Sequence, residues 1–454
     1  MGLYKRPDTK IKNYLLYIFF IMIGYLAVFP WFSEAGEPAE IFTLQQTIED
    51  AIKANIGLKS SQEEIKAAVS TKKYQRTNFF PTLSATYQYK HNYEERSNKY
   101  FGITTPRNEY TLVTSFNQPL FTGFSLLNQY KIAIAGLNAA KINEKLIRQA
   151  VVFEAKKVYF SLLKAQKLMG ISSEAVTQLE AHERVAKNFY EVGMTPLNDL
   201  LKAQVELANV RQDLIIAQNN LEIIKSNFNL LLRRHINATI ELQDILDYTS
   251  FKKGIDYCLE TAMQNRLEKK AADLETEISE KELKLSKKDY YPSISLQGNY
   301  YNRGTEADLN GDNGISDPDS WDVLAVATWN FWEWGKTGYG VKEKMSRLAQ
   351  KQYHKTEISD NIRLEVKQAY LKTNEAEKNI ITVKKAVEQA KENFRISEER
   401  YKEQMATSTD VLDAQTLLSR TMTNYYSALY DFKISKAYLY WAMGQAEKIE
   451  TGIQ

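Results

Sequence analysis

Four short stretches of the chain alternate between apolar and polar residues. In the first, one face holds Leu83, Ala85, Tyr87, Tyr89, His91 and Tyr93, and the residues between them are polar. A period of two predicts β-strands, at about 82–93 and 109–118 in the first half and about 293–303 and 321–331 in the second. Each stretch has about ten residues, the length that a tilted transmembrane strand needs.

The same alternation also fits a half-buried sheet of a soluble protein. Trp321 and Trp329 fall on the same face at opposite ends of one predicted strand, as in the aromatic girdles of membrane barrels. Four strands are too few to close a barrel, so one chain alone would leave exposed edges. Several chains contributing four strands each would remove those edges, and we therefore favour a membrane barrel.

Long stretches without proline follow each pair of predicted strands. No proline occurs between Phe124 and Pro196, and none follows Pro318. Helices are therefore expected at about 124–190 and 335–402, each on the order of 100 Å long. Two shorter return helices are expected at about 196–235 and 408–443. Their apolar residues recur every seven positions, as in Leu200, Leu207, Leu214, Leu221 and Phe228, which predicts left-handed coiled-coil packing.

The turns between these helices carry capping residues. Thr195 and Pro196 fit the N-cap and first position of one return helix, and Thr407 fits the N-cap of the other, with Asp410 three residues later. An acidic residue at that position is favourable beside the positive end of the helix dipole. Both turns are short, so each long helix should be antiparallel to its return helix.

The two halves of the chain resemble each other at one fixed offset. Tyr190 and Tyr401 lie 211 positions apart, and the same shift aligns Met194 with Met405 and brings the strand motifs into register. This predicts an internal duplication, with repeats at 36–245 and 246–445 and a tail at 446–454.

Residues 1–35 have the features of a secretory signal. Basic residues such as Lys5 and Arg6 precede an apolar run at 15–29, and Ser33-Glu34-Ala35 is a suitable cleavage site. The alternative is an uncleaved anchor helix at 15–32. The full chain has a net charge of +3, and cleavage of the signal would leave about +1, which gives no electrostatic reason to expect a nucleic-acid partner.

The residues of common catalytic and metal sites do not occur in suitable patterns. Cys258 is the only cysteine, and the four histidines lack metal-ligand spacing. Gly335-Lys336-Thr337 ends like a phosphate loop, but Asn330 replaces the required glycine. An acidic loop at 304–320 approaches a calcium-loop pattern, yet Asn313 occupies the glycine position, so a plain surface loop is favoured. We therefore expect neither an enzyme nor a bound cofactor.

At the level of motifs, the chain resembles the TolC family of outer-membrane efflux and secretion channels. The resemblance is carried by the strands FFPTLSATYQY and YYPSISLQGNYY, the joints QPLFTGF and NFWEWG, and the turns EVGMTPLNDLLKAQ and KEQMATSTDVLDAQ. It implies a mixed α+β membrane protein: a homotrimer with a twelve-stranded β-barrel in the outer membrane and a helical coiled-coil barrel in the periplasm. The implied partners are a periplasmic membrane-fusion adaptor, an inner-membrane transporter of the RND or ABC type, and outer-membrane lipid.

The resemblance also assigns roles to residues at the two helix turns. It implies that Asp410 and Asp413 ring the periplasmic mouth as a gate that favours cations, and that Tyr401 and Asp199 help to close it. The partner-docking hairpin tips would consist of Gly193, Met194, Thr195, Gln404, Met405 and Ala406. Ala406 stands where the family has a locking Arg, and Gln404 replaces the expected Gly, so closure should depend on other contacts.

The function expected from this resemblance is passive export through a duct of a tripartite efflux pump or a type I secretion system. A periplasmic coiled-coil adaptor or scaffold, anchored by the uncleaved N-terminal helix, is the alternative. It would share the long helices but has no need of four girdled strands. The sequence does not identify the cargo.

Overall fold

The computed structural model describes residues 41–448 except 99, 101, 246–248, 310 and 312–316. The predicted signal peptide, residues 1–35, lies outside the described residues, as do positions 449–454 of the predicted tail. Asn313 of the acidic loop lies outside them too.

The chain divides into two compact units. The smaller one consists of Met1–Phe42 and Thr239–Gln243, and its described part is a short parallel strand pair, β1 (Ile41–Phe42) with β6 (Glu241–Leu242). The larger unit holds all other helices and strands of the described residues. The predicted repeats are not separate units, because a strand of each half pairs with a strand of the other in one sheet.

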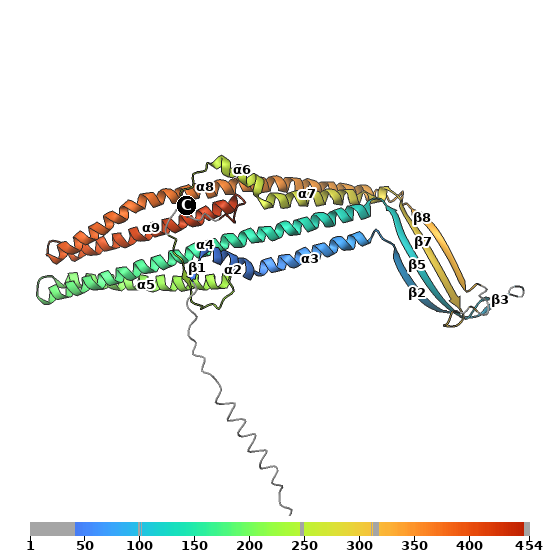
Figure 1. Cartoon of the computed structure of the whole chain (residues 1–454), viewed down its shortest axis with the longest axis horizontal. Helices are drawn as coiled ribbons and strands as arrows, with labels where there is room; N and C mark the ends of the chain where they lie inside the picture. The colour runs from blue at the N-terminus through green and yellow to red at the C-terminus, as the bar shows by residue number, and fades with distance from the viewer. Residues whose placement is uncertain are drawn as a thin grey trace, which may run out of the picture. The chain divides into compact units, whose positions relative to one another are not determined.

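That sheet is antiparallel and has the strand order β2-β5-β7-β8 (Figure 1). Its members are β2 (Thr82–His91), β5 (Asn108–Thr122), β7 (Ser293–Gly304) and β8 (Asp319–Thr328). A small ribbon, β3 (Arg96–Asn98) with β4 (Gly102–Thr105), extends the connection from β2 to β5. Every residue of β2 is exposed in the single chain, and β2 and β8 each have only one neighbouring strand within the described part of the protein.

Two of the predicted strands end at other residues than expected. Strand β5 continues to Thr122 rather than stopping near 118, because its pairing with β7 resumes after an irregularity between Pro119 and Phe121. Proline has no N–H for the ladder, so a bulge is the form in which a strand accommodates it. The predicted strand 321–331 was wrong at its end: β8 stops at Thr328, and Trp329 lies beyond it.

Two pairs of helices have the same lengths. Helices α4 (Ser125–Glu191) and α8 (Lys336–Lys402) have 67 residues each, and α5 (Leu197–Leu231) and α9 (Ser408–Ala442) have 35 each. The expected end of the first return helix at 235 was wrong, because Arg233 adopts a left-handed conformation with φ 55° just after α5. The duplication itself stays a prediction.

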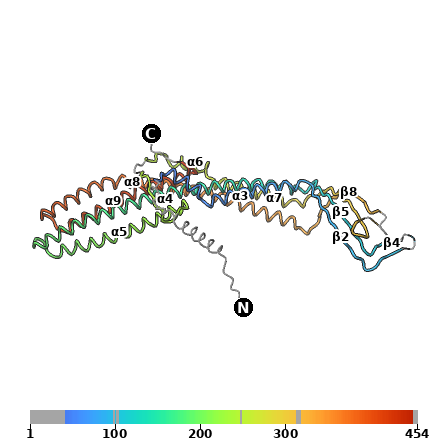
Figure 2. Tube along the Cα trace, turned by 60° about the horizontal axis from the view of Figure 1, so that its bottom comes forward, coloured from blue at the N-terminus to red at the C-terminus, as the bar shows by residue number. Residues whose placement is uncertain are grey.

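The four helices form two antiparallel hairpins, α4–α5 and α8–α9 (Figure 1). Figure 2 shows that, within the larger unit, the hairpin turns and the sheet lie at opposite ends of the long helices. Helix α9 packs against α8 and also against α4, and so joins the hairpins. The heptad residues Leu200, Leu207, Leu221 and Phe228 are buried, in keeping with coiled-coil packing.

Shorter helices accompany the long ones on the side of the sheet. They are α2 (Leu44–Ala54), α3 (Ile56–Thr77), α6 (Ile255–Asn265), α7 (Leu267–Ser286) and the 3₁₀ helix η1 (Lys288–Tyr290). Helices α2 and α3 pack against α4, α6 packs against α8, and α7 packs against both long helices. Thr43 and Gln46 form the expected capping box of α2.

A buried arginine organises the core where α6, α8 and α9 meet. Arg266 is 6% exposed and pairs with Glu268 and Glu365, at 2.8 Å in each case. Its guanidinium also donates to the carbonyl oxygen of Ala442 and lies over the ring of Trp441, 4.8 Å from the centroid. Cys258 is buried in the apolar cluster at this place, as a small packed residue.

None of the helices in the described residues is long and apolar enough to cross a membrane.

Candidate functional site

The turns of the two hairpins have the same backbone geometry. In the first, Gly193 has φ 73°, and the N–H of Met194 donates to the carbonyl oxygen of Phe189 at 2.8 Å. In the second, Gln404 has φ 60°, and the N–H of Met405 donates to Arg400 at 2.7 Å. A residue with a side chain is therefore held in the left-handed region at Gln404, where Gly193 meets the same requirement without steric cost.

The helices that leave these turns are capped differently. Thr195 was expected as the N-cap of α5, but Pro196 takes that position and makes no side-chain bond, so that prediction was wrong by one residue. The hydroxyl of Thr195 is buried without a hydrogen-bond partner in the described part of the chain. Thr407 caps α9 as expected, since its Oγ1 accepts from the N–H of Asp410 at 3.3 Å.

The two acidic residues expected at the gate lie on exposed positions of α9, but their surroundings differ. The Asp410 carboxylate accepts bonds from the N–H and the hydroxyl of Thr407, both at 2.8 Å. These bonds lower the pKa of Asp410. Asp413 lies one turn further along and lines a pocket of about 420 Å³ between α5 and α9.

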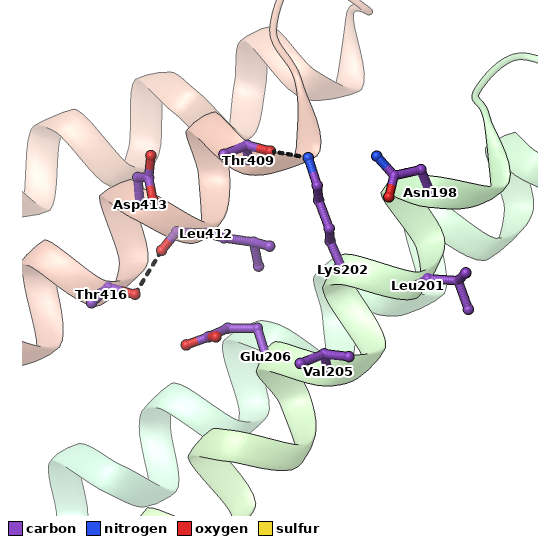
Figure 3. Close-up of a pocket in the computed structure, with 9 residues that line it drawn as sticks. All are labelled: Asn198, Leu201, Lys202, Val205, Glu206, Thr409, Leu412, Asp413 and Thr416. Carbon is purple, nitrogen blue, oxygen red and sulfur yellow. Dashed lines mark hydrogen bonds between the residues drawn. The ribbon is translucent and has the colours of Figure 1, made fainter.

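The pocket has polar and apolar walls (Figure 3). Helix α5 contributes Asn198, Leu201, Lys202, Val205 and Glu206, and α9 contributes Thr409, Leu412, Asp413 and Thr416. The Nζ atom of Lys202 reaches across to Thr409 and donates to its Oγ1 at 3.1 Å. The structure thus brings Asp413 together with a lysine that the sequence reading had not singled out.

Tyr401 and Asp199, the expected closing pair, are neighbours but are not hydrogen-bonded. Tyr401 is 2% exposed, and its hydroxyl has no hydrogen-bond partner among the described residues. Burial and the charge of Asp199 together raise the pKa of Tyr401. Its ring packs instead on His182 and Phe189, with centroids 4.8 and 5.7 Å away.

His182 is a further residue of this site that the sequence had not indicated. Its Nε2 shares a hydrogen bond of 2.9 Å with Oγ of Ser408, the first residue of α9. His182 is 5% exposed, and burial lowers its pKa to about 4, against the opposite effects of Glu398 and Asp199. The imidazole is therefore neutral near pH 7.

Polar contacts and apolar clusters join the two hairpins near their turns. The polar contacts are His182–Ser408, Lys202–Thr409 and a bond from Nε2 of Gln404 to the sulfur of Met194, at 2.9 Å. Tyr401 and Val411 pack with Leu200 in one apolar cluster, and Leu412 packs with Leu207 in another. Met405 is exposed, and Ala406 packs beside the first cluster. Contacts of this kind can hold two helix pairs together.

Aromatic side chains gather at the other end of the molecule. Trp321 in β8 is 75% exposed, and Trp329 is 55% exposed. Three further aromatic residues, Phe331, Trp332 and Trp334, are exposed where β8 leads into α8. They belong to the NFWEWG joint, and their aromatic side chains were the signal that could have added them to the predicted girdle.

No group of three or more His, Cys, Asp or Glu residues in the described ranges is arranged to hold a metal ion.

Comparisons with known proteins agree with this architecture. The family model described as outer membrane efflux protein matches residues 47–232 and 258–445. Among curated proteins, the outer membrane protein TolC of Vibrio cholerae serotype O1 is 24% identical over 171 residues. That match covers 37% of this chain and 38% of the relative's length.

Solved structures show the same fold over most of the chain. The CmeC outer membrane channel of Campylobacter jejuni has a TM-score of 0.79 at 14% identity, covering 89% of this chain and 86% of its own. The outer membrane protein VceC of Vibrio cholerae has a TM-score of 0.78 at 17% identity, covering 88% and 96%. The open-state MtrE channel of Neisseria gonorrhoeae has a TM-score of 0.74 at 18% identity, covering 89% of each chain.

Proposed function

Because the chain belongs to the outer membrane efflux protein family, whose members are channels rather than enzymes, we propose that it forms the outer-membrane exit duct of an export system. In this proposal three copies of the chain assemble into one duct. The duct conducts substrate passively from a tripartite efflux pump or a type I secretion system to the exterior.

The observation that carries this proposal is the open sheet. Strands β2 and β8 are its edges, and β2 is exposed along its whole length. An exposed edge strand presents unpaired N–H and C=O groups that can bond to another strand, so soluble proteins normally cover or shorten it. Pairing β8 of one copy with β2 of the next would close twelve strands into a cylinder when three copies meet.

The helices support the same assembly. Helix α5 exposes a series of large apolar side chains, Leu201, Val205, Ile215, Ile216, Ile223 and Leu230. Neighbouring copies would cover this series and extend the helix pairs into a tube. Since α4 and α8 are each on the order of 100 Å long, the tube would reach far into the periplasm. There its tips, at Gly193, Met194, Thr195, Gln404, Met405 and Ala406, would meet a membrane-fusion adaptor that connects to an inner-membrane transporter.

The hairpin ends would then be the gate. In a trimer, Asp410 and Asp413 would each occur three times around the mouth, as expected for a filter that favours cations. Tyr401 would contribute to closure through its packing on His182, with Asp199 beside it. A periplasmic adaptor or scaffold, the alternative function, gives no reason for an open sheet with aromatic residues at its ends.

Membrane fractionation and electrophoresis test the proposal. The mature protein should sediment with outer-membrane markers. In electrophoresis without heating it should migrate as a trimer, and after boiling it should migrate as a monomer slightly smaller than the full chain of 52.3 kDa. Purified protein in planar bilayers should form discrete conducting pores. Recovery as a monomer in the detergent-free soluble fraction would contradict the duct and favour the adaptor.

A further inference from the structure

Lys202 and Asp413 occupy equivalent positions on two helices of the same length. Helix α5 begins at Leu197 and α9 at Ser408, and Lys202 and Asp413 are each the sixth residue of their helix. The turns before the two helices also share one geometry. The two side chains therefore stand at matching levels of their hairpins, with opposite charges.

Both side chains line the pocket between α5 and α9 (Figure 3). The ammonium group of Lys202 bonds to the neutral hydroxyl of Thr409, which leaves its charge uncompensated by that contact. In the described part of the chain, neither Lys202 nor Asp413 takes part in an ion pair within 4 Å. Glu206, four residues after Lys202 on α5, lines the same pocket, so its fixed charges are one ammonium group and two carboxylates, none of them in an ion pair within 4 Å among the described residues.

Asp410 contrasts with Asp413. Its carboxylate turns back onto Thr407, and it does not line the pocket. The two acidic residues of the mouth therefore stand in different electrostatic surroundings: Asp410 stands at the start of α9, and Asp413 lies opposite a lysine.

We propose that Lys202 sets the charge selectivity of the duct by offsetting Asp413. The inference rests on the proposed trimer, in which three Lys202 side chains would alternate with three Asp413 side chains around the mouth. Opposite charges within a Debye length of about 8 Å largely cancel for a passing ion. Lys202 then reduces the net negative charge that Asp413 and Glu206 give to the pocket, and anionic or zwitterionic solutes meet a weaker barrier than the acidic residues alone would present.

Reversal potentials in planar bilayers under a KCl gradient test this role. Lys202→Gln should raise the ratio of potassium to chloride permeability by at least about twofold, since fixed charge at a constriction controls the local ion concentration. Asp413→Asn should lower the ratio, and the double variant should return close to the wild-type value.

Two matched variants separate charge from other effects. Thr409→Val removes the hydrogen-bond partner of Lys202 but keeps its charge, so the permeability ratio should change less than in Lys202→Gln. Lys225→Gln removes a lysine of α5 outside the pocket, one that pairs with Glu222, and should leave the ratio unchanged.

The inference fails if Lys202→Gln leaves the ratio of a conducting pore unchanged, or if Thr409→Val or Lys225→Gln shifts it equally. In those cases the proposed duct still stands. If the wild-type protein forms no pore at all, the duct itself is wrong and the inference falls with it.

Discussion

His182 on α4 and Ser408 on α9 are 226 positions apart in the chain, and a hydrogen bond of 2.9 Å joins Nε2 of the one to Oγ of the other. The bond is buried and spans the two hairpins just inside their turns. It involves a titratable group, so the contact between the hairpins should depend on pH.

Acid should weaken the closed arrangement of the hairpins. Burial lowers the pKa of His182 to about 4 from 6.5, so the separated state, in which His182 is hydrated, binds the proton more readily. The contribution to closure is complete above pH 6.5 and is lost as pH falls towards 4, by up to about tenfold per pH unit. Pore conductance should therefore rise when the pH is lowered from 7.5 to 5.

A variant that cannot titrate checks the assignment of this pH response. In His182→Gln, the amide can still bond to Ser408, and the rise in conductance on acidification should disappear. His354→Gln, which changes an exposed histidine of α8, is the matched control and should keep the response. An acid response that survives in His182→Gln would assign the effect to other groups.

Substitutions at the left-handed position of each turn, Gln404 and Gly193, should change stability in opposite directions. Gln404→Gly relieves the left-handed conformation but also removes the exposed bond to Met194, so the net effect should be a stabilisation of at most about 1 kcal/mol. Gly193→Ala introduces a side chain at φ 73°, where no atom lies within 4 Å of the new Cβ, so backbone strain alone should destabilise it by about 1 kcal/mol. Thermal unfolding of the detergent-solubilised protein measures both. Shifts of the same sign would contradict the explanation.

Loss of Arg266 should be far more damaging than loss of an exposed arginine on α8. Arg266→Met removes a buried guanidinium that pairs with two partly exposed carboxylates, Glu268 and Glu365, and should destabilise the protein by about 2–3 kcal/mol. Arg363→Gln breaks an exposed pair with Asp360 and should change stability by less than about 1 kcal/mol. The yield of folded protein and the melting temperature distinguish the two. Equal effects would show that the Arg266 network is dispensable.

Substitution of Asp410 and Asp413, the acids of the proposed mouth, should distinguish helix capping from ion selectivity. Asp410→Ala removes the capping box of α9 and should increase protease cleavage near residue 407, whereas Asp413→Ala should not. The double variant should reduce cation selectivity or the block of the pore by cations. Unchanged selectivity would remove the filter assignment but not the duct.

The long elements could be predicted because their signals are local. Proline positions limited α4 and α8, and the alternation of residues located all four strands of the main sheet. The errors occurred where local signals compete. The predicted strand ends near 118, just before Pro119, yet pairing of β5 with β7 continues to Thr122 around the bulge. Thr195 looked like a cap, but the chain places Pro196 there.

The contacts between hairpins could not be predicted for a different reason. His182 is a lone histidine in a long helix, and nothing nearby in the sequence indicates that Ser408 lies against it. The pairing depends on how α4 packs against α9, which is a property of the assembled fold. Motif resemblance directed attention to Tyr401 and Asp199, and the structure places His182 beside them.

Strand β2 is exposed at every position, which implies that folding of the sheet is coupled to subunit assembly. In a single chain, β2 is stabilised mainly by its pairing with β5 and buries little side-chain area, while ordering it costs conformational entropy. In a duct made of several chains, the missing stabilisation arrives only with the neighbouring subunit, so it depends on subunit concentration. The sheet of an isolated protomer would then be only marginally stable, and it would reach its final structure as the subunits assemble.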